Sequence, residues 1–341
     1  MKLVEASGDA TTIGQITGEA LREEIRECAE IRRIDQQHSD WDERWPATKA
    51  ALQKHIPLVL EEMEGTAEGA NLPLETILKL NIPGYERALD APQECTNIAF
   101  SEGPDGPIWG KNNDGSPPHL PPVARLVRRK DGIPQLNWTF CGMLATIDGF
   151  NAEGVAVGHS SVGSLFGQSA HHVPIRLWAY EGLFASRNAP DFIRHMCALP
   201  TFGKGYSSLL VDADGVLCSL ESPCPLTQVR WPEAGETYLN CSNYYQLDPI
   251  SEVDWRQPEG KRNAIARAEM LDVRFKSGRG GRDLAAMKDV LAYHGDPSIC
   301  RHGEDGSSCT EYSMIGLCAE RKAMYLHDRP CRGGEWTEVQ L

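Results

Sequence analysis

The 341-residue sequence lacks two features that mark membrane and secreted proteins. No apolar run approaches the ~20 residues that a membrane-spanning helix needs. The first eight residues, Met1 to Gly8, contain no hydrophobic stretch of the kind found in signal peptides. We therefore expect a cytoplasmic protein that has no membrane partner. Its content of 41% hydrophobic and 24% charged residues is that of an ordinary globular chain with a sizeable core.

Positive charge is also scarce. The chain has 34 Lys and Arg against 48 Asp and Glu, which gives a formal net charge of −14. Binding to nucleic acid needs a basic surface. The one basic cluster, Arg125 to Lys130, is short and is typical of a solvated strand edge. We expect no nucleic-acid partner.

Paired cysteines are missing as well. Eleven cysteines are present, but none forms a C-x-x-C pair, which excludes a zinc ribbon and a thioredoxin-like motif. In a reducing compartment most of these thiols are small buried side chains. Cys300, His302 and Cys309 lie close together in the sequence, but their spacing fits no standard zinc site. We expect no metal and no cofactor.

Regular alternation of strands and helices is absent, which argues against a doubly wound parallel sheet. Up to about residue 85 the apolar pattern predicts helices and no strand, and from Cys95 onward short apolar runs alternate with Gly, Asp and Pro turns. This order favours an α+β fold with layered αββα packing. The helices are expected over residues 12–36, 43–65, 73–80, 174–186, 191–198, 259–275 and 282–292.

The most informative segment runs from Glu94 to Gly115. Cys95 opens a short strand-like run, a Pro/Gly turn folds the chain back, and a second strand delivers Lys111 and Asp114. Such a hairpin brings both charges beside Cys95. A thiol flanked by a cation and a hydrogen-bonding carboxylate is a nucleophile with a lowered pKa. The alternative for any one of eleven cysteines is a core position, and the place of Cys95 between the helical and β regions favours catalysis.

Further motifs follow in order along the chain: Gly14-x-x-x-Gly18-Glu19-Ala20-Leu21, Glu64–Ala70, Gly110–Asp114, Gly149–Gly154, Asn240–Tyr245, Ser298–His302 and Cys309–Ile315. Together with Cys95-Thr96, they resemble the acyl-coenzyme A:isopenicillin N acyltransferase-like family (peptidase C45 type). That family is a branch of the N-terminal nucleophile (Ntn) hydrolases. The chain is more distantly similar to choloylglycine (conjugated bile acid) hydrolases and penicillin V acylases.

The resemblance implies a four-layer αββα sandwich and a chain that cuts itself between Glu94 and Cys95. Residues 1–94 would be a helical α subunit, and residues 95–341 the catalytic β subunit. The freed α-amine of Cys95, with an ordinary pKa of about 7.7–8.0, would take the thiol proton. A heterodimer of the cleavage products is expected, with higher homo-oligomers left open.

The resemblance also assigns catalytic roles. Asp114 would hydrogen-bond the α-ammonium or a polar substrate group, and Lys111 would lower the thiol pKa. Asn243 would donate to the oxyanion, because a side-chain amide can meet the developing negative charge.

Three further residues are assigned to substrate binding. Thr96 stands next to the nucleophile. Asn151 would orient the tetrahedral intermediate, although a turn role is an equal alternative. Arg262 would bind a substrate carboxylate or brace Asp114, with Arg267 as the competing assignment.

The implied function is hydrolysis of a small amide or peptide-like substrate, or acyl transfer to an amine, through a thioester; an acyl-coenzyme A donor is among the expected substrates. A second hypothesis is an uncleaved, non-catalytic relative that binds a small ligand. It is supported by Glu94, where self-cleaving members often carry Gly. A third is a thiol redox protein, against which the lack of a nearby resolving cysteine counts.

Overall fold

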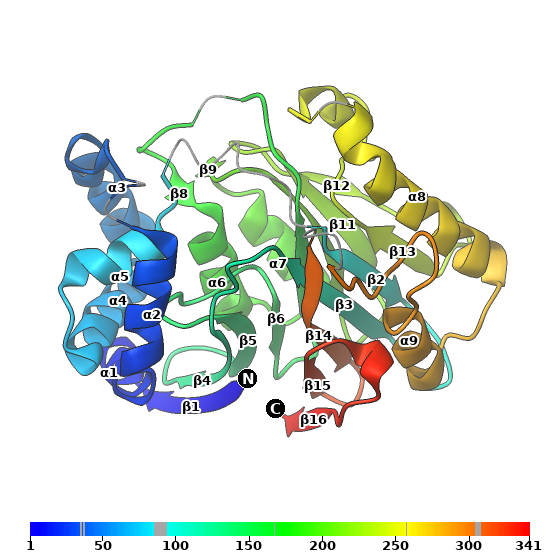
Figure 1. Cartoon of the computed structure of the whole chain (residues 1–341), viewed down its shortest axis with the longest axis horizontal. Coiled ribbons are helices and arrows are strands. Elements are labelled where there is room, and N and C mark those ends of the chain that lie inside the picture. Colours follow the sequence, from blue (N-terminus) through cyan, green and yellow to red (C-terminus); the bar gives the residue numbers. More distant parts are fainter. Residues whose placement is uncertain (35, 37, 85–93, 167, 257, 304–307) are drawn as a thin grey trace.

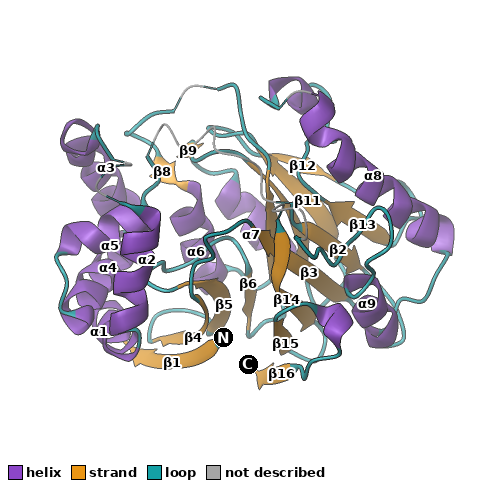
Figure 2. Cartoon of the chain, viewed as in Figure 1, coloured by secondary structure: helices purple, strands orange, loops and turns teal. Residues whose placement is uncertain are grey.

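Two β-sheets packed against each other occupy the centre of the molecule, with helices on both outer sides (Figures 1 and 2). This arrangement comes from a computed structural model that describes residues 1–34, 36, 38–84, 94–166, 168–256, 258–303 and 308–341. It is the mixed α+β architecture that the sequence predicts. Among the described residues, no helix combines the length and the apolar character needed to cross a bilayer.

The larger sheet has eight strands. In spatial order they are β1 (Lys2–Gly8), β4 (Pro122–Arg129), β5 (Gln135–Phe140), β6 (Gly149–Asn151), β7 (Ala156–Ser161), β10 (Tyr206–Val211), β11 (Leu217–Ser222) and β12 (Gln228–Arg230). All its pairings are antiparallel except that of β1 with β4.

The smaller sheet has six strands and carries the segment singled out above. Its spatial order is β13 (Tyr238–Cys241), β2 (Thr96–Phe100), β3 (Ile108–Gly115), β14 (Cys309–Leu317), β15 (Lys322–His327) and β16 (Thr337–Gln340), all antiparallel. A separate parallel pair is formed by β8 (Val173–Pro174) and β9 (Thr201–Phe202).

Helices cover the two outer faces and the N-terminal end. They are α1 (Ala10–Ala20), α2 (Arg22–Arg32), α3 (Trp41–His55), α4 (Pro57–Ala70), α5 (Leu74–Asn81), α6 (Ile175–Ala185), α7 (Ala189–Met196), α8 (Pro258–Phe275) and α9 (Leu284–Leu291). Short 3-10 turns are η2 (Ile250–Val253), η3 (Lys276–Gly278) and η4 (Pro330–Arg332).

Strand β2 shows why the layers form. Successive side chains of a strand point to opposite faces. Ile98 and Phe100 lie in the cluster that includes Phe275 of α8 and Met287 of α9, whereas Ala99 lies in the core between the sheets. Both faces of the strand are therefore buried, which places the residues at its start deep inside the molecule.

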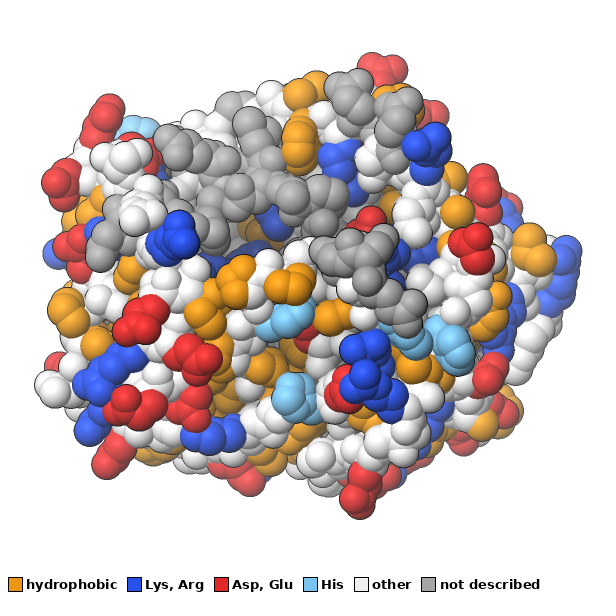
Figure 3. Space-filling model, in the orientation of Figure 1, with side chains coloured by type: hydrophobic (Ala, Val, Ile, Leu, Met, Phe, Trp, Pro, Cys, Tyr) orange, Lys and Arg blue, Asp and Glu red, His pale blue; other side chains and the backbone are white. Residues whose placement is uncertain are grey.

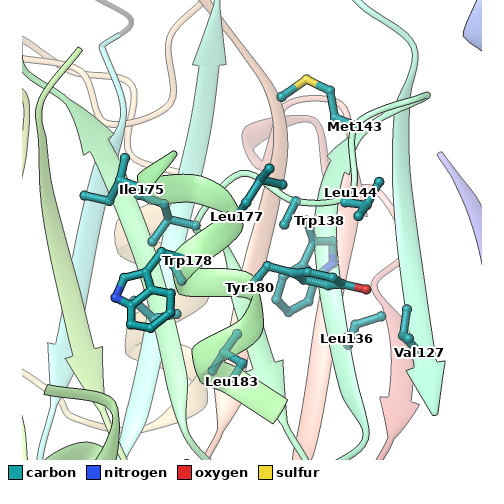
Figure 4. Close-up of a cluster of buried hydrophobic side chains, with 14 of the residues drawn as sticks. Val127, Leu136, Trp138, Met143, Leu144, Ile175, Leu177, Trp178, Tyr180 and Leu183 are labelled. Carbon is teal, nitrogen blue, oxygen red and sulfur yellow. The ribbon is translucent and has the colours of Figure 1, made fainter. Parts of the chain in front are cut away.

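Helix α6 packs against the outer face of the larger sheet. Figure 4 shows Leu177, Tyr180 and Leu183 of this helix facing Leu136 and Trp138 of β5. This is the apolar helix face that the pattern of residues 174–186 predicts.

The N-terminal part corrects one expectation. The sequence predicts no strand before residue 85, yet β1 pairs in parallel with β4. The strand signal is weak because only Val4 and Ala6 are buried in an otherwise exposed strand at the sheet edge. The predicted helix of residues 12–36 is also divided, since α1 ends at Ala20 and α2 begins at Arg22.

The Gly14-x-x-x-Gly18 motif has a direct structural reason. A Cβ atom on Gly14 would lie 2.2 Å from the carbonyl oxygen of Glu62 in α4, and one on Gly18 would lie 2.2 Å from that of Thr66. Only residues without a side chain allow α1 and α4 to touch backbone to backbone. The motif therefore serves helix packing.

The basic cluster is not a solvated edge. Strand β4 lies between β1 and β5, and Arg125 is fully buried. Its guanidinium forms an ion pair with Glu62 of α4, whose carboxylate also accepts a hydrogen bond of 2.9 Å from Tyr180 of α6. This buried pair ties three layers together, which explains why charge occurs within an interior strand.

Candidate active site

The predicted hairpin is present. Strands β2 and β3 pair with Thr96 opposite Asn112, and Cys95 immediately precedes β2. Cys95 is buried, and its Sγ lies 3.8 Å from both the Asn113 side-chain oxygen and the Asp114 carbonyl oxygen. The register therefore brings the thiol alongside the end of β3.

Lys111 is anchored beneath the thiol by an aspartate that sequence reasoning missed. Its Nζ donates to both carboxylate oxygens of Asp148, at 2.7 and 2.6 Å, and to the Asn113 side-chain oxygen at 3.3 Å. Asp148 also accepts from the backbone N–H of His159 at 2.9 Å. Cys95 and Lys111 thus share Asn113 as a neighbour.

Charge within this buried group is set by Lys111. Burial alone would raise the pKa of Asp148, but the His159 ring and the Lys111 ammonium hold it well below its usual range. Burial, helped by the Lys111 charge, lowers the pKa of His159 to about 4 against the opposing effect of Asp148. At neutral pH we therefore assign an ionised Asp148 and a neutral His159.

The thiol itself departs from the prediction. Burial, with a smaller contribution from the Asp114 charge, raises the pKa of Cys95 to about 11 against the opposing effect of the Lys111 charge. The prediction of a lowered pKa is therefore wrong for the intact chain, because desolvation outweighs the nearby cation. The thiol is protonated at neutral pH and needs a base.

Asp114 is the candidate for that base, since its charge acts on the thiol. Its Oδ1 accepts a hydrogen bond of 2.7 Å from Thr310 Oγ1, while its buried Oδ2 has no hydrogen-bond partner among the described residues. Burial raises the pKa of this carboxyl to about 7, against the opposing effects of Thr310, Arg267 and Arg301. A carboxyl titrating near neutral pH is suited to proton transfer.

Arg267 takes the place that the sequence assigned to Arg262. Its Nη1 donates to the Cys95 carbonyl oxygen at 2.8 Å and to the Thr96 hydroxyl, and it is fully buried. Arg262 is exposed on the same helix. Five helical residues turn the chain by about 140°, so the two arginines point to different faces. The assignment to Arg262 is corrected accordingly.

Asn243 joins the same group. Its side-chain oxygen accepts from Arg267 Nη2 at 3.1 Å, and its Nδ2 donates to the Ser161 carbonyl oxygen at 2.8 Å. An amide nitrogen carries two hydrogens. Within the described part of the chain, the Ser161 carbonyl oxygen takes one of them, and the second has no printed acceptor, so Asn243 stays the predicted oxyanion donor.

Glu94, the residue before the nucleophile, has a partner. Its carboxylate forms an ion pair with Arg301, which also donates to the Asn263 side-chain oxygen at 3.1 Å. The same oxygen accepts from Arg267 Nε at 2.8 Å. Asn263 therefore links the arginine that holds Glu94 to the arginine that holds the Cys95 carbonyl.

Asn151 lies outside this group. Its amide donates to the Leu183 and Ser186 carbonyl oxygens and accepts from the backbone N–H groups of Glu153 and Val155. Two of these hydrogen bonds hold the turn and two tie it to the end of α6, so the predicted contact with a reaction intermediate is not supported, and the role the structure gives Asn151 is a structural one.

Sequence reasoning missed Asp148, His159, Arg301 and Thr310. Asp148 stands directly before a motif that was noted, Gly149–Gly154, and Arg301 and Thr310 lie within the C-terminal motifs. The sequence motifs therefore pointed to the neighbourhood of these residues. Their roles could not be predicted, because they depend on contacts between segments more than 30 residues apart.

Known proteins were compared with the chain in three ways. No family model matches it, and no curated protein matches it in sequence. Among solved structures, it is similar to a variant of conjugated bile acid hydrolase from Clostridium perfringens, with 12% identity, a TM-score of 0.50, and coverage of 72% of this chain and 92% of that one.

Two other solved structures are similar at lower scores. Penicillin V acylase from Agrobacterium tumefaciens has 12% identity and a TM-score of 0.49, and covers 72% of this chain and 86% of its own. The Caenorhabditis elegans ortholog of N-acylethanolamine-hydrolyzing acid amidase has 14% identity and a TM-score of 0.47, with coverage of 66% and 93%. At these identities the likeness concerns the fold, and the chain shares the α+β fold of the bile acid hydrolase.

Proposed function

We propose that this protein is a cysteine Ntn enzyme that cuts its own chain between Glu94 and Cys95 and then hydrolyses or transfers acyl groups at a small amide. The observation that carries the proposal is the arrangement around the predicted scissile bond. Arg301 holds the Glu94 side chain on one side, and Arg267 holds the Cys95 carbonyl on the other. Both flanks of one peptide bond are thus fixed beside a buried thiol.

The proposed self-cleavage begins at the thiol. Asp114 accepts the thiol proton, and Cys95 Sγ attacks the Glu94 carbonyl carbon. The peptide C–N bond breaks, the departing nitrogen takes up a proton, and a thioester joins Glu94 to Cys95. Water then hydrolyses the thioester, releasing the Glu94 carboxylate and a Cys95 with a free amine and a free thiol.

In the mature enzyme, the Cys95 amine is the base for its own thiol. Its ordinary pKa of about 7.7–8.0 lies near working pH. Attack on a substrate amide gives a tetrahedral oxyanion that accepts the second amide hydrogen of Asn243. Collapse expels the amine and leaves a thioester, which water or a second amine resolves.

The substrate class is a small acyl amide, or an acyl-coenzyme A donor paired with an amine acceptor. The similar bile acid hydrolase is named for the hydrolysis of a conjugated bile acid. Placement in the acyltransferase-like branch rests on the sequence motifs alone.

After the cut, residues 1–94 and 95–341 are proposed to stay together as a heterodimer. Strand β1 is paired along its length with β4, and α1 contacts α4 within the N-terminal part. The sheet pairing crosses the cut, so the two pieces share one fold.

A second candidate is an uncleaved ligand-binding protein. It is favoured by Glu94 in the position before the nucleophile and by the raised pKa of Cys95.

Intact mass spectrometry of freshly purified, denatured protein separates the two. The proposal expects two species, residues 1–94 and residues 95–341, with the second beginning at Cys95. A Cys95→Ala variant serves as the control and remains a single species with the circular dichroism spectrum of a folded protein. A wild-type chain that stays whole for days and shows no turnover would favour the binding protein.

A further inference from the structure

We propose that His294, His302 and Cys331 form a binding site for a zinc ion. Their ligating atoms all lie within 4.8 Å of one another. His302 Nε2 lies 3.2 Å from Cys331 Sγ, and the two imidazole rings stack with centroids 5.4 Å apart. Tetrahedral zinc bonds of about 2.0–2.3 Å separate neighbouring ligands by roughly 3.3–3.8 Å. Small side-chain rotations therefore bring all three around one ion.

Three separate segments supply these ligands. His294 follows α9, His302 forms an isolated bridge with Cys309, and Cys331 lies in η4. The loop after α9 is held in place because the Tyr293 carbonyl oxygen accepts from the N–H groups of residues 299 and 300, at 2.9 and 2.7 Å. The folded chain thus assembles the group before any ion arrives.

The site is open to solvent. His294 is exposed, while His302 and Cys331 are half-buried. Histidine side chains are prominent on the face seen in Figure 3. An ion can enter from solvent, and water can take the fourth position, as in zinc sites with three protein ligands.

The donor atoms select the metal. Two imidazole nitrogens and one thiolate suit zinc, whereas Mg²⁺ and Ca²⁺ prefer oxygen ligands. Within the described part of the chain, this is the one group of three such side chains whose ligating atoms come this close.

The proposal departs from the sequence-based expectation of no metal. That expectation rested on the spacing of Cys300, His302 and Cys309. The structure instead places Cys309 Sγ 3.6 Å from His119 Nε2 and brings in Cys331 from 29 residues beyond His302. Spacing along the chain therefore says little about this site.

The competing state is a disulfide. The Cys300 thiol is hydrogen-bonded to Cys331, so a two-electron oxidant such as hydrogen peroxide, which is reduced to water and takes up both thiol protons, would join the two sulfurs and remove a zinc ligand. Arg301, which pairs with Glu94, lies between Cys300 and His302 in the chain. Either state would tie η4 to the segment that carries Arg301.

The test uses the full chain, reduced, freed of metal with a chelator, and titrated with zinc chloride alone by isothermal calorimetry. We expect one zinc per chain, a rise in Tm on binding, and, with Co²⁺ in place of zinc, a thiolate-to-cobalt charge-transfer absorption. Mg²⁺ and Ca²⁺ at the same concentrations should give no signal.

Cys331→Ser and His302→Ala should each weaken zinc binding by about 100-fold or more, while Cys309→Ser and Cys197→Ser should bind as the wild type does. All variants are checked for folding by circular dichroism. The proposal is overturned if the reduced wild type binds no zinc, if Cys331→Ser binds as tightly as wild type, or if the protein as purified holds a Cys300–Cys331 disulfide and takes up no zinc after reduction.

Discussion

Two groups in this molecule are each built around a cysteine, and different chemistry is proposed for them. Around Cys95, the thiol, Lys111, Asp148 and Arg267 are all buried. Around Cys331, the neighbouring imidazoles are exposed or half-buried. Burial around Cys95 favours a neutral thiol and fixed hydrogen bonds, whereas access to solvent around Cys331 allows an ion to enter. The difference indicates that the surroundings of a thiol decide its role more than its neighbours in sequence do.

The largest expected effect comes from removing the buried thiol. Cys95→Ser leaves a hydroxyl that is a far weaker nucleophile at neutral pH. We expect self-cleavage and turnover to fall by at least about 1,000-fold, a magnitude comparable to loss of one essential catalytic group. Cleavage is followed by denaturing gel electrophoresis and mass spectrometry, with Cys331→Ser as the matched control. If Cys331→Ser lost cleavage equally, the two groups would not be separate.

The second effect concerns the arginine within the buried group. Arg267→Ala leaves the Cys95 carbonyl and the Asn243 side-chain oxygen without their donor. We expect the free energy of unfolding to fall by about 3 kcal/mol, and cleavage to slow in parallel. The matched control is Arg262→Ala on the exposed face, which should change stability by less than about 0.5 kcal/mol. Urea unfolding measures the stability of both variants. Equal losses of stability would reject the assignment of the buried role to Arg267.

A third, smaller effect lies between the two groups, at Arg301. Arg301→Gln removes the ion pair with Glu94 while keeping much of the side-chain volume. We expect the cleavage rate to fall by about 10-fold, because the scissile bond is held less firmly. Glu94→Gln should slow cleavage to a similar extent, and the double variant should be no slower than either single one. Faster cleavage in Glu94→Gln would mean that the ion pair opposes the reaction.

The last effect is a pH dependence confined to the buried group. The pKa of Asp114 is about 7 in the folded chain, against about 3.9 when unfolded. The folded state therefore binds this proton more tightly, and its contribution to stability is full below pH 4 and is lost as pH rises to 7. The whole change is at most about 4 kcal/mol at 1.36 kcal/mol per unit.

Asp114→Asn cannot titrate, so the stability difference between wild type and variant should shift against wild type from pH 5 to pH 7.5 in urea unfolding. His159, whose pKa is lowered to about 4, acts in the opposite direction but is present in both proteins. A difference that does not change with pH would contradict a raised pKa at Asp114.

The hairpin could be predicted from sequence because its signals are local. A Pro/Gly turn and alternating apolar residues placed Lys111 and Asp114 beside Cys95, and the register of β2 with β3 agrees. The partners of these residues could not be predicted, since Asp148 meets Lys111 across 37 positions and Arg267 meets Cys95 across 172. Burial, which raises the thiol pKa, is likewise a property of packing.

Strand β1 links the folding of the larger sheet to the N-terminal residues. Because β1 lies beside β4 in the larger sheet, that sheet is complete only when the first eight residues have joined it. In an intact chain this pairing is intramolecular. If the chain is cut as proposed, refolding needs two molecules to meet, so recovery from denaturation would depend on protein concentration. The proposed cut would therefore make folding before maturation easier than recovery from the unfolded state after it.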